Sequence, residues 1–76
     1  MSFHLSITSF EQIKHFVSVA ARQPFDIRVG NERQNINGKD FMGMVSLDYT
    51  RPVAVQADCT ADEFAAFRKD VLAVQG

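Results

Sequence analysis

The sequence has few of the residues that mark particular classes of protein. Its single cysteine, Cys59, cannot form an internal disulfide and has no second cysteine for a metal site, so we expect a reduced thiol in a loop. No run approaches the roughly eighteen apolar residues of a membrane span, and no basic segment leads into an apolar run at the N-terminus. We therefore expect a cytoplasmic protein that has neither a membrane span nor a signal peptide.

An excess of positive charge is also missing. Eight basic and nine acidic residues give a net charge of −1 and are scattered along the chain, so there is no basic stripe for a phosphate backbone or an anionic lipid. We therefore do not expect nucleic acid or a membrane as a partner. The sequence also has no Gly-rich phosphate loop and no cluster of metal-ligating residue types, so we expect no cofactor and no metal.

The chain does contain enough apolar sequence for a core. Hydrophobic residues make up 46% of the 76 residues, and seven residues are phenylalanine. A chain of this length buries only about 60% of the surface that its unfolded form exposes, which leaves no room for a second lobe or a deep enzyme cleft. We therefore expect a single domain over residues 1–76, and we do not expect an enzyme.

Alternating apolar and polar residues predict four strands. At the start of the chain, Phe3, Leu5 and Ile7 alternate with His4 and Ser6, which is the period of a strand with one wet face. The same period recurs further along the chain, on both sides of a turn signal. The predicted strands lie at residues 2–7, 25–29, about 33–37 and 53–57.

Apolar residues at helical spacing, each time behind a capping residue, predict three helices. Thr8 or Ser9 begins the first helix, Asp40 occupies the N-cap position of a short second helix, and Thr60 with Glu63 forms a capping box at the start of the third. The predicted helices lie at about 9–22, over about six residues from Phe41, and at about 60–74.

These elements follow the order βαββαβα. Each strand has one apolar and one polar face, which suits an antiparallel sheet covered by helices on one side only. We therefore predict an α+β open-faced sandwich, with a four-stranded antiparallel sheet and three helices on one face. The predicted core contains Leu5, Phe16, Ile27, Val29, Val55 and Phe67. The predicted open face carries His4, Arg28 and Gln56.

The segment INGKDFMGMVSL, with FDIRV ahead of it and ADEFAAFRKDVL behind it, resembles the HPr family, the small histidine-containing phosphocarriers of the bacterial sugar phosphotransferase system. The resemblance covers nearly the whole chain and is most specific over GKDFMGMVSL. It implies an HPr-like domain. In that family a histidine at the start of the first helix accepts the phosphoryl group, and an arginine two residues later and then a proline complete the site.

The residues of the phosphocarrier site are replaced in this chain. Placed without a gap against the second-helix motif, the histidine position falls on Ser9, the arginine position on Glu11 and the proline position on Gln12. A serine hydroxyl without a base is a poor nucleophile at neutral pH, and a carboxylate repels an incoming phosphate. We interpret His15 and His4 as surface residues, because His15 lies about two turns into its helix and His4 has no ligand or triad partner nearby in sequence.

The resemblance also implies a regulatory position at Asp40. Regulated members of the family have a serine there, and its phosphorylation by a dedicated kinase directs binding to a catabolite-control transcription factor. Asp40 has a permanent charge of about −1, compared with about −1.5 to −2 for phosphoserine, and offers no hydroxyl to a kinase. Two interpretations stay open: a fixed charge in place of the phosphoserine, or only a helix cap.

In the family, the second helix and the exposed flank of the first helix contact partner proteins. Helical spacing directs residues 44 and 47 toward the core and leaves Phe41, Met42 and Val45 partly exposed. Such methionine and aromatic side chains are typical of adaptable docking patches, although a small domain can also use the whole run as core. The candidate partner-binding residues are Phe10, Glu11, Lys14, Ser18, Asp40, Phe41, Met42 and Val45.

Three functions are compatible with these observations. The first is an HPr-like regulatory module of carbohydrate uptake or catabolite control, which binds a transcription regulator or a phosphotransferase-system component and carries no phosphate. The second is a phosphocarrier that uses another acceptor. The third is a small-ligand sensor or a structural module that only shares the fold, because fold does not determine function.

Overall fold

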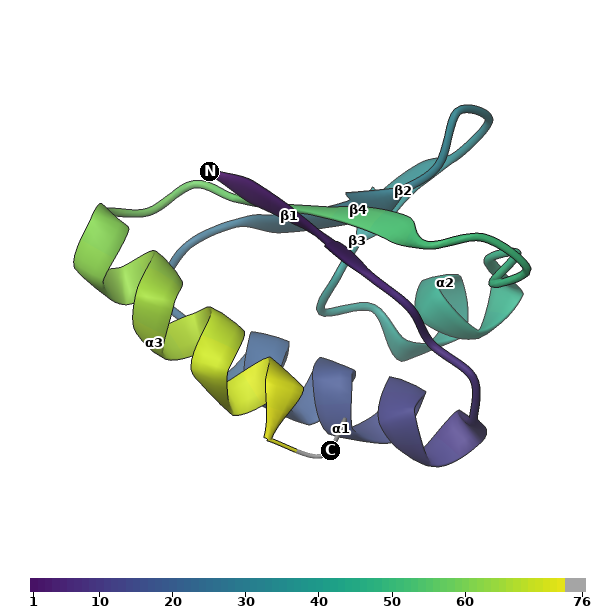
Figure 1. The fold of residues 1–76 in the computed structure, drawn as a ribbon, viewed down its shortest axis with the longest axis horizontal. Coiled ribbons are helices and arrows are strands. Elements are labelled where there is room, and N and C mark those ends of the chain that lie inside the picture. Colours follow the sequence, from purple (N-terminus) through teal and green to yellow (C-terminus); the bar gives the residue numbers. More distant parts are fainter. Residues whose placement is uncertain (74–76) are drawn as a thin grey trace.

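The computed structural model of the chain describes residues 1–73, and its elements follow the predicted order βαββαβα. Figure 1 shows the sheet along one side of the molecule and the three helices along the other, which confirms the open-faced α+β sandwich. The predicted end of the third helix at residue 74 lies outside the described residues. The elements are β1 (Ser2–Leu5), α1 (Phe10–Ala21), β2 (Ile27–Gly30), β3 (Asn35–Asn37), α2 (Phe41–Ser46), β4 (Val53–Ala57) and α3 (Ala61–Leu72).

The sheet is antiparallel throughout and has the strand order β1-β4-β2-β3. Strand β4 therefore lies in the interior and pairs with β1 on one side and with β2 on the other. Strand β1 ends two residues earlier than predicted, where Leu5 pairs with Val53. The reason is that Pro52 precedes Val53 and has no N–H to continue the ladder.

The two strands of the β2–β3 hairpin are also shifted relative to the prediction. Strand β2 begins at Ile27, opposite the end of β4 at Ala57, rather than at residue 25. Strand β3 begins at Asn35, because the loop before it is held by Asn31, whose Oδ1 accepts hydrogen bonds from the N–H of Arg33 at 2.8 Å and of Gln34 at 2.9 Å. These side-chain bonds replace the first pairs of the predicted strand.

Both long helices begin with a capping side chain, as predicted. The Oγ of Ser9 accepts a hydrogen bond from the N–H of Gln12 at 3.3 Å, and the Oε1 of Gln12 accepts one from the N–H of Thr8 at 2.6 Å. At the start of α3, Thr60 and Glu63 form a reciprocal capping box. Backbone donors that a helix start leaves without intrahelical partners are thus bonded by side chains.

A cluster of buried apolar side chains fills the space between the sheet and the helices. Phe67 lies at its centre, and its ring meets those of Phe3, Phe16 and Phe25 edge to face, with centroids 6.2, 6.0 and 5.9 Å away. Every residue of the predicted core is at most 3% exposed, and His4, Arg28 and Gln56 are exposed as predicted. The division of the strands into a dry and a wet face is therefore confirmed.

Two kinds of feature are missing from the described part of the chain. None of the helices within residues 1–73 has both the length and the apolar character needed to cross a membrane. Within the same residues, no three metal-ligating side chains come together. Cys59 is a free, half-buried cysteine in the loop between β4 and α3.

Candidate functional site

The starts of α1 and α2 lie together at one end of the molecule. Phe10 is the first residue of α1 and Phe41 is the first residue of α2, and their rings meet edge to face with centroids 5.7 Å apart. Phe10 is nevertheless 52% exposed and Phe41 36% exposed. The structure thus brings together two candidate partner-binding residues that are thirty-one positions apart in sequence (41 − 10 = 31) and leaves both rings in contact with solvent.

The loop before α2 is held by side chains that fix where the helix begins. The Oδ1 of Asn37 accepts a hydrogen bond from the N–H of Lys39 at 2.9 Å, and the Nζ of Lys39 donates to the carbonyl of Gln23 at 2.8 Å, just beyond the end of α1. Gly38 sits directly on the core, because a Cβ at this position would lie 2.7 Å from a methyl group of Ile27. The contacts of Asn37, Gly38 and Lys39 therefore fix the orientation of α2 relative to α1.

The rest of α2 divides into a buried and an exposed side. Met44 is fully buried, and Leu47, the residue just after the helix, is 6% exposed, whereas Met42 is 73% exposed and Val45 41% exposed. The exposure predicted for Phe41, Met42 and Val45 is confirmed, and the interpretation of the whole run as core is wrong. We call Phe10, Phe41, Met42 and Val45 the apolar patch. Its role as a contact surface stays a prediction.

Charged side chains of α1 border the apolar patch. The Nζ of Lys14 lies 3.8 Å from the Oε1 of Glu11 and 5.8 Å from the centroid of the Phe10 ring, so it contacts both an anion and an aromatic face. Ser18 is exposed one turn further along α1. Within residues 1–73, no hydrogen bond or ring contact links Ser18 to the patch, and the structure does not join it to the other candidates.

The position that corresponds to the phosphoryl-accepting histidine is the N-cap of α1. Ser9 occupies it, and its hydroxyl oxygen is already the acceptor for the N–H of Gln12. Glu11 places an exposed carboxylate in the first turn of the helix. The partial positive charge of a helix N-terminus normally attracts anions, and at this end of α1 a carboxylate of the chain itself is present.

Neither histidine lies at this end of α1. The Nε2 of His15 is 2.8 Å from the carbonyl oxygen of Asp70 in the last turn of α3. A carbonyl only accepts, so Nε2 carries the hydrogen. His15 is half-buried and links two helices, which corrects its interpretation as a simple surface residue. His4 is exposed on the open face of the sheet, as predicted.

Asp40 stands at the N-cap of α2, but within residues 1–73 its carboxylate makes no capping hydrogen bond. The expected side-chain cap is therefore wrong. The backbone of Asp40 is fully used, since its N–H donates to the carbonyl of Asn37 at 3.0 Å and its carbonyl accepts from Met44 at 2.9 Å. The carboxylate is exposed and leans over the first turn, because a Cβ at Gly43 would lie 3.1 Å from its Oδ2. The negative charge of Asp40 therefore lies exposed to solvent beside the N-terminus of α2.

Tyr49 follows α2 and closes its C-terminal end. The Tyr49 hydroxyl donates a hydrogen bond to the carbonyl of Met44, which also accepts one from the N–H of Leu47 at 3.4 Å. The phenol is half-buried, and burial raises the pKa of Tyr49 to about 12. Sequence reasoning did not single out this residue, because nothing in its neighbours indicates that the ring turns back onto the helix.

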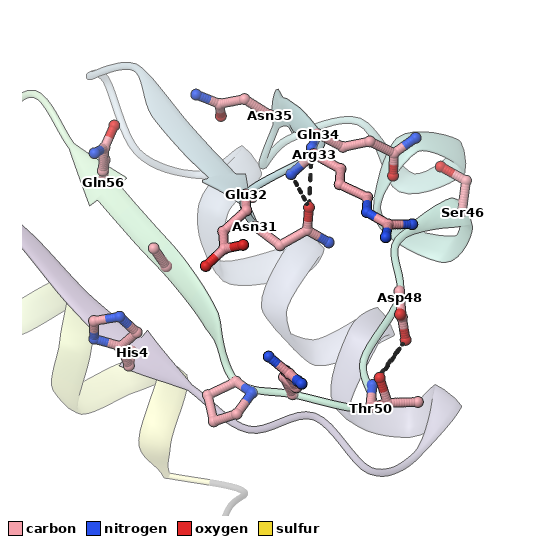
Figure 2. Close-up of a pocket in the computed structure, with 14 residues that line it drawn as sticks. His4, Asn31, Glu32, Arg33, Gln34, Asn35, Ser46, Asp48, Thr50 and Gln56 are labelled. Carbon is pink, nitrogen blue, oxygen red and sulfur yellow. Dashed lines mark hydrogen bonds between the residues drawn. The ribbon is translucent and has the colours of Figure 1, made fainter.

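A second feature that sequence reasoning missed is a concave region on the open face of the sheet (Figure 2). The β2–β3 loop borders it on one side and the segment between α2 and β4 on the other. Asn31 and Asp48 are the available sequence signals, because such side chains often bond the backbone two residues further on. We call this region the basin, and it is lined by His4, Gly30–Asn35, Ser46, Asp48, Thr50–Pro52, Ala54 and Gln56.

Comparison with known proteins shows which known fold the chain adopts. No family model matches the chain, and no curated protein sequence matches it. Among solved structures, the chain is similar to one titled as the crystal structure of HPr-C-His from Thermoanaerobacter tengcongensis, with a TM-score of 0.72, 19% sequence identity, and coverage of 97% of this chain and 86% of that one. A likeness at this identity bears on the fold alone. The chain therefore has an HPr-like fold, the fold of a phosphocarrier, as the resemblance predicted.

Proposed function

We propose that the chain is an HPr-like regulatory module that binds a protein partner of the phosphotransferase system or of catabolite control, and that it carries no phosphoryl group. The observation behind this proposal is the apolar patch, in which Phe10 and Phe41 meet edge to face but stay exposed beside Met42. Exposed aromatic and methionine side chains at the centre of a surface, with charges around them, are typical of protein interfaces.

The charges around the patch support a protein rather than a lipid as the occupant. Glu11 and Lys14 stand on one side of Phe10 and Asp40 stands before Phe41. A patch that is bordered by both signs suits a partner with complementary charges of both signs. A membrane surface would favour cations alone.

The altered phosphocarrier position supports the absence of phosphoryl transfer. Within residues 1–73, Ser9 has no imidazole beside it, because His15 is bonded to α3 and His4 lies on the sheet. An incoming phosphate would meet the carboxylate of Glu11 in place of a guanidinium. Two like charges about 4 Å apart repel by about 1 kcal/mol in water and by about 4 kcal/mol at a partly desolvated surface. No observation favours a phosphocarrier with another acceptor.

Phosphoenolpyruvate and the phosphotransferase enzyme I test the chemical half of this proposal. We expect intact mass at neutral pH to show no added phosphate on the chain, while an ordinary HPr in the same mixture is phosphorylated. The combined variant Ser9→His, Glu11→Arg and Gln12→Pro restores the residues of the family and should gain phosphate. An acid-labile phosphate on the unaltered chain would refute the proposal.

Calorimetric titration tests the binding half. We expect the chain to bind purified enzyme I or a purified catabolite-control transcription regulator of the organism that encodes it, with an affinity that does not change after incubation with the phosphorylating mixture. Binding to neither protein would contradict the proposal. Binding that appears only after phosphorylation would favour the phosphocarrier function instead.

A further inference from the structure

The floor of the basin is a row of residues that crosses all four strands on the open face. The strand register pairs His4 with Ala54, Ala54 with Gly30, and Gly30 with Asn35. The two central members have at most a methyl side chain, so the middle of the row is lower than its polar ends. The neighbouring row carries larger side chains at its centre, Gln56 and Arg28. A hollow in the sheet surface follows from the small residues alone.

The β2–β3 loop forms one wall because Gly30 has no side chain. A Cβ at this position would lie 2.3 Å from the carbonyl oxygen of Gln34 and 2.9 Å from the Cα of Asn35. The loop backbone thus occupies the space of a side chain, and it rises on the side of the sheet away from α1 and α3 (Figure 1). Asn31 then fixes the loop by accepting two backbone hydrogen bonds. This wall holds Arg33.

The segment between α2 and β4 forms the opposite wall. The Oδ1 of Asp48 accepts hydrogen bonds from the N–H of Thr50 at 2.9 Å and from its hydroxyl at 2.8 Å, which fixes the turn ahead of Arg51. Figure 2 shows Arg33 extending from the other wall toward Ser46 and Asp48. Each wall therefore contributes one arginine to the same hollow.

The two arginines share an anionic neighbour, Asp48, which neither of them contacts directly among the described residues. Within residues 1–73, neither guanidinium forms a hydrogen bond or an ion pair at contact distance. The pKa of Asp48 is lowered mainly by its hydrogen bonds from Thr50, and the charges of Arg33 and Arg51 lower it further. Both arginines also line the basin together with Asp48. The N–H donors of each planar guanidinium can therefore bind the two oxygens of an anionic group.

Most of the other polar side chains of the basin are carboxylates and amides. Glu32, Gln34, Asn35 and Gln56 line it, and among the described residues their side chains have no hydrogen-bond partner. Carboxylates and amides bond hydroxyl groups, and the floor at Gly30 and Ala54 has no aromatic or long aliphatic side chain. The lining as a whole suits a small molecule with one anionic group and several hydroxyl groups.

We propose that the basin binds a small hydroxyl-rich anion, a phosphorylated or carboxylated polyol, with Arg33 and Arg51 holding the anionic group and the side chains of Glu32, Gln34 and Gln56 holding hydroxyl groups. This inference goes beyond the proposed function, because it uses the open face of the sheet and none of the four residues of the apolar patch. A bound anion would also join the two walls, which are separate segments of the chain.

Amide chemical shifts in an NMR titration test the proposal with four probes. Glucose 6-phosphate and gluconate are hydroxyl-rich molecules with a phosphate and a carboxylate group, respectively. Inorganic phosphate has the anionic group without the polyol, and glucose has the hydroxyl groups without the anion. We expect saturable shifts at Gly30, Arg33, Arg51 and Ala54 with glucose 6-phosphate or gluconate, weaker binding of phosphate, and none with glucose. Absence of saturable shifts with both hydroxyl-rich anions, or equal binding of glucose, would overturn it.

Charge-removing variants with a matched control complete the test. Arg33→Gln and Arg51→Gln should each weaken binding by about tenfold, because each removes a charge-assisted pair of hydrogen bonds. Arg28→Gln removes the same charge from the same face of the sheet but outside the basin, and it should leave the affinity unchanged. An equal loss in Arg28→Gln would show a nonspecific charge effect, and unchanged affinity in both basin variants would refute the site.

Discussion

The ring of Phe10 stands edge-on to the ring of Phe41, at an interplanar angle of 79° and a centroid distance of 5.7 Å. Edge-to-face pairs of this kind contribute about 0.5–1.5 kcal/mol beyond their buried area, so the pair ties the start of α2 to the start of α1. Both rings keep an exposed side beside Met42 and Val45. The same contact therefore stabilises the helix arrangement and leaves a preformed apolar surface exposed to solvent.

Met42→Asp should abolish partner binding and leave the fold intact. Met42 is 73% exposed, and a charge at an exposed position shifts stability by less than about 0.5 kcal/mol. In a complex the carboxylate would be desolvated without a pair, at a cost of several kcal/mol. Ala65→Asp on the exposed side of α3 is the matched control and should bind normally. A Met42→Asp protein without a cooperative melting transition would contradict this assignment.

Asp40→Asn separates the charge of Asp40 from its shape. Because the carboxylate makes no capping hydrogen bond within residues 1–73, we expect the free energy of unfolding to change by less than about 1 kcal/mol, through the helix dipole alone. If the fixed charge substitutes for a phosphoserine, partner affinity should fall at the same time. Chemical denaturation and calorimetric titration measure the two quantities. Unchanged affinity would leave Asp40 with a structural role only.

Phe67→Ala should remove most of the stability of the domain. The side chain is 1% exposed and contacts three other aromatic rings, and such truncations cost about 3–5 kcal/mol out of a total of about 5–15 kcal/mol. Phe10→Ala is the control, since it removes the same ring from a half-exposed position. We expect a lost or strongly lowered melting transition only for Phe67→Ala. Equal melting temperatures for the two variants would contradict the core assignment.

Alkaline pH should destabilise the fold through Tyr49. Burial raises its pKa from 10.0 to about 12, so the unfolded chain releases this proton at a lower pH than the folded chain does. The contribution of the protonated Tyr49 to the free energy of unfolding is complete below about pH 10 and is lost as the pH rises toward 12. Tyr49 is the only tyrosine and the chain has no tryptophan, so ultraviolet absorbance follows this one group. Tyr49→Phe should lack this part of the alkaline loss. An unshifted phenol titration would refute the prediction.

Much of the fold could be predicted because the periodicity is local. Alternation around Leu5 and Val55 and helical spacing around Phe16 and Phe67 indicate which side of each element is apolar, and packing then follows. The strand ends could not be predicted from the same pattern. They depend on a proline just before β4, the partner of β1, and on an asparagine side chain in the hairpin loop, which act across strands or across the turn.

The candidate site was predicted less completely, for a related reason. Helical spacing correctly separated Met42 from Met44, since both lie on one helix. The missing cap of Asp40, the link between His15 and α3, and the basin depend on side-chain rotamers and on loops that fold back over the sheet. No period in the sequence encodes these contacts between distant segments.

The interior position of β4 has a consequence for synthesis of the chain. Among the described residues, β1 pairs only with β4, and β2 has β4 on one side, although β4 is the sixth element in chain order. While the first fifty-two residues are made, α1 and the β2–β3 hairpin can form, but the edge of β2 and all of β1 remain unpaired. Such long-range pairing delays folding. We therefore expect the sheet to close late, when residues 53–57 insert between β1 and β2, which are both made in the first half of synthesis.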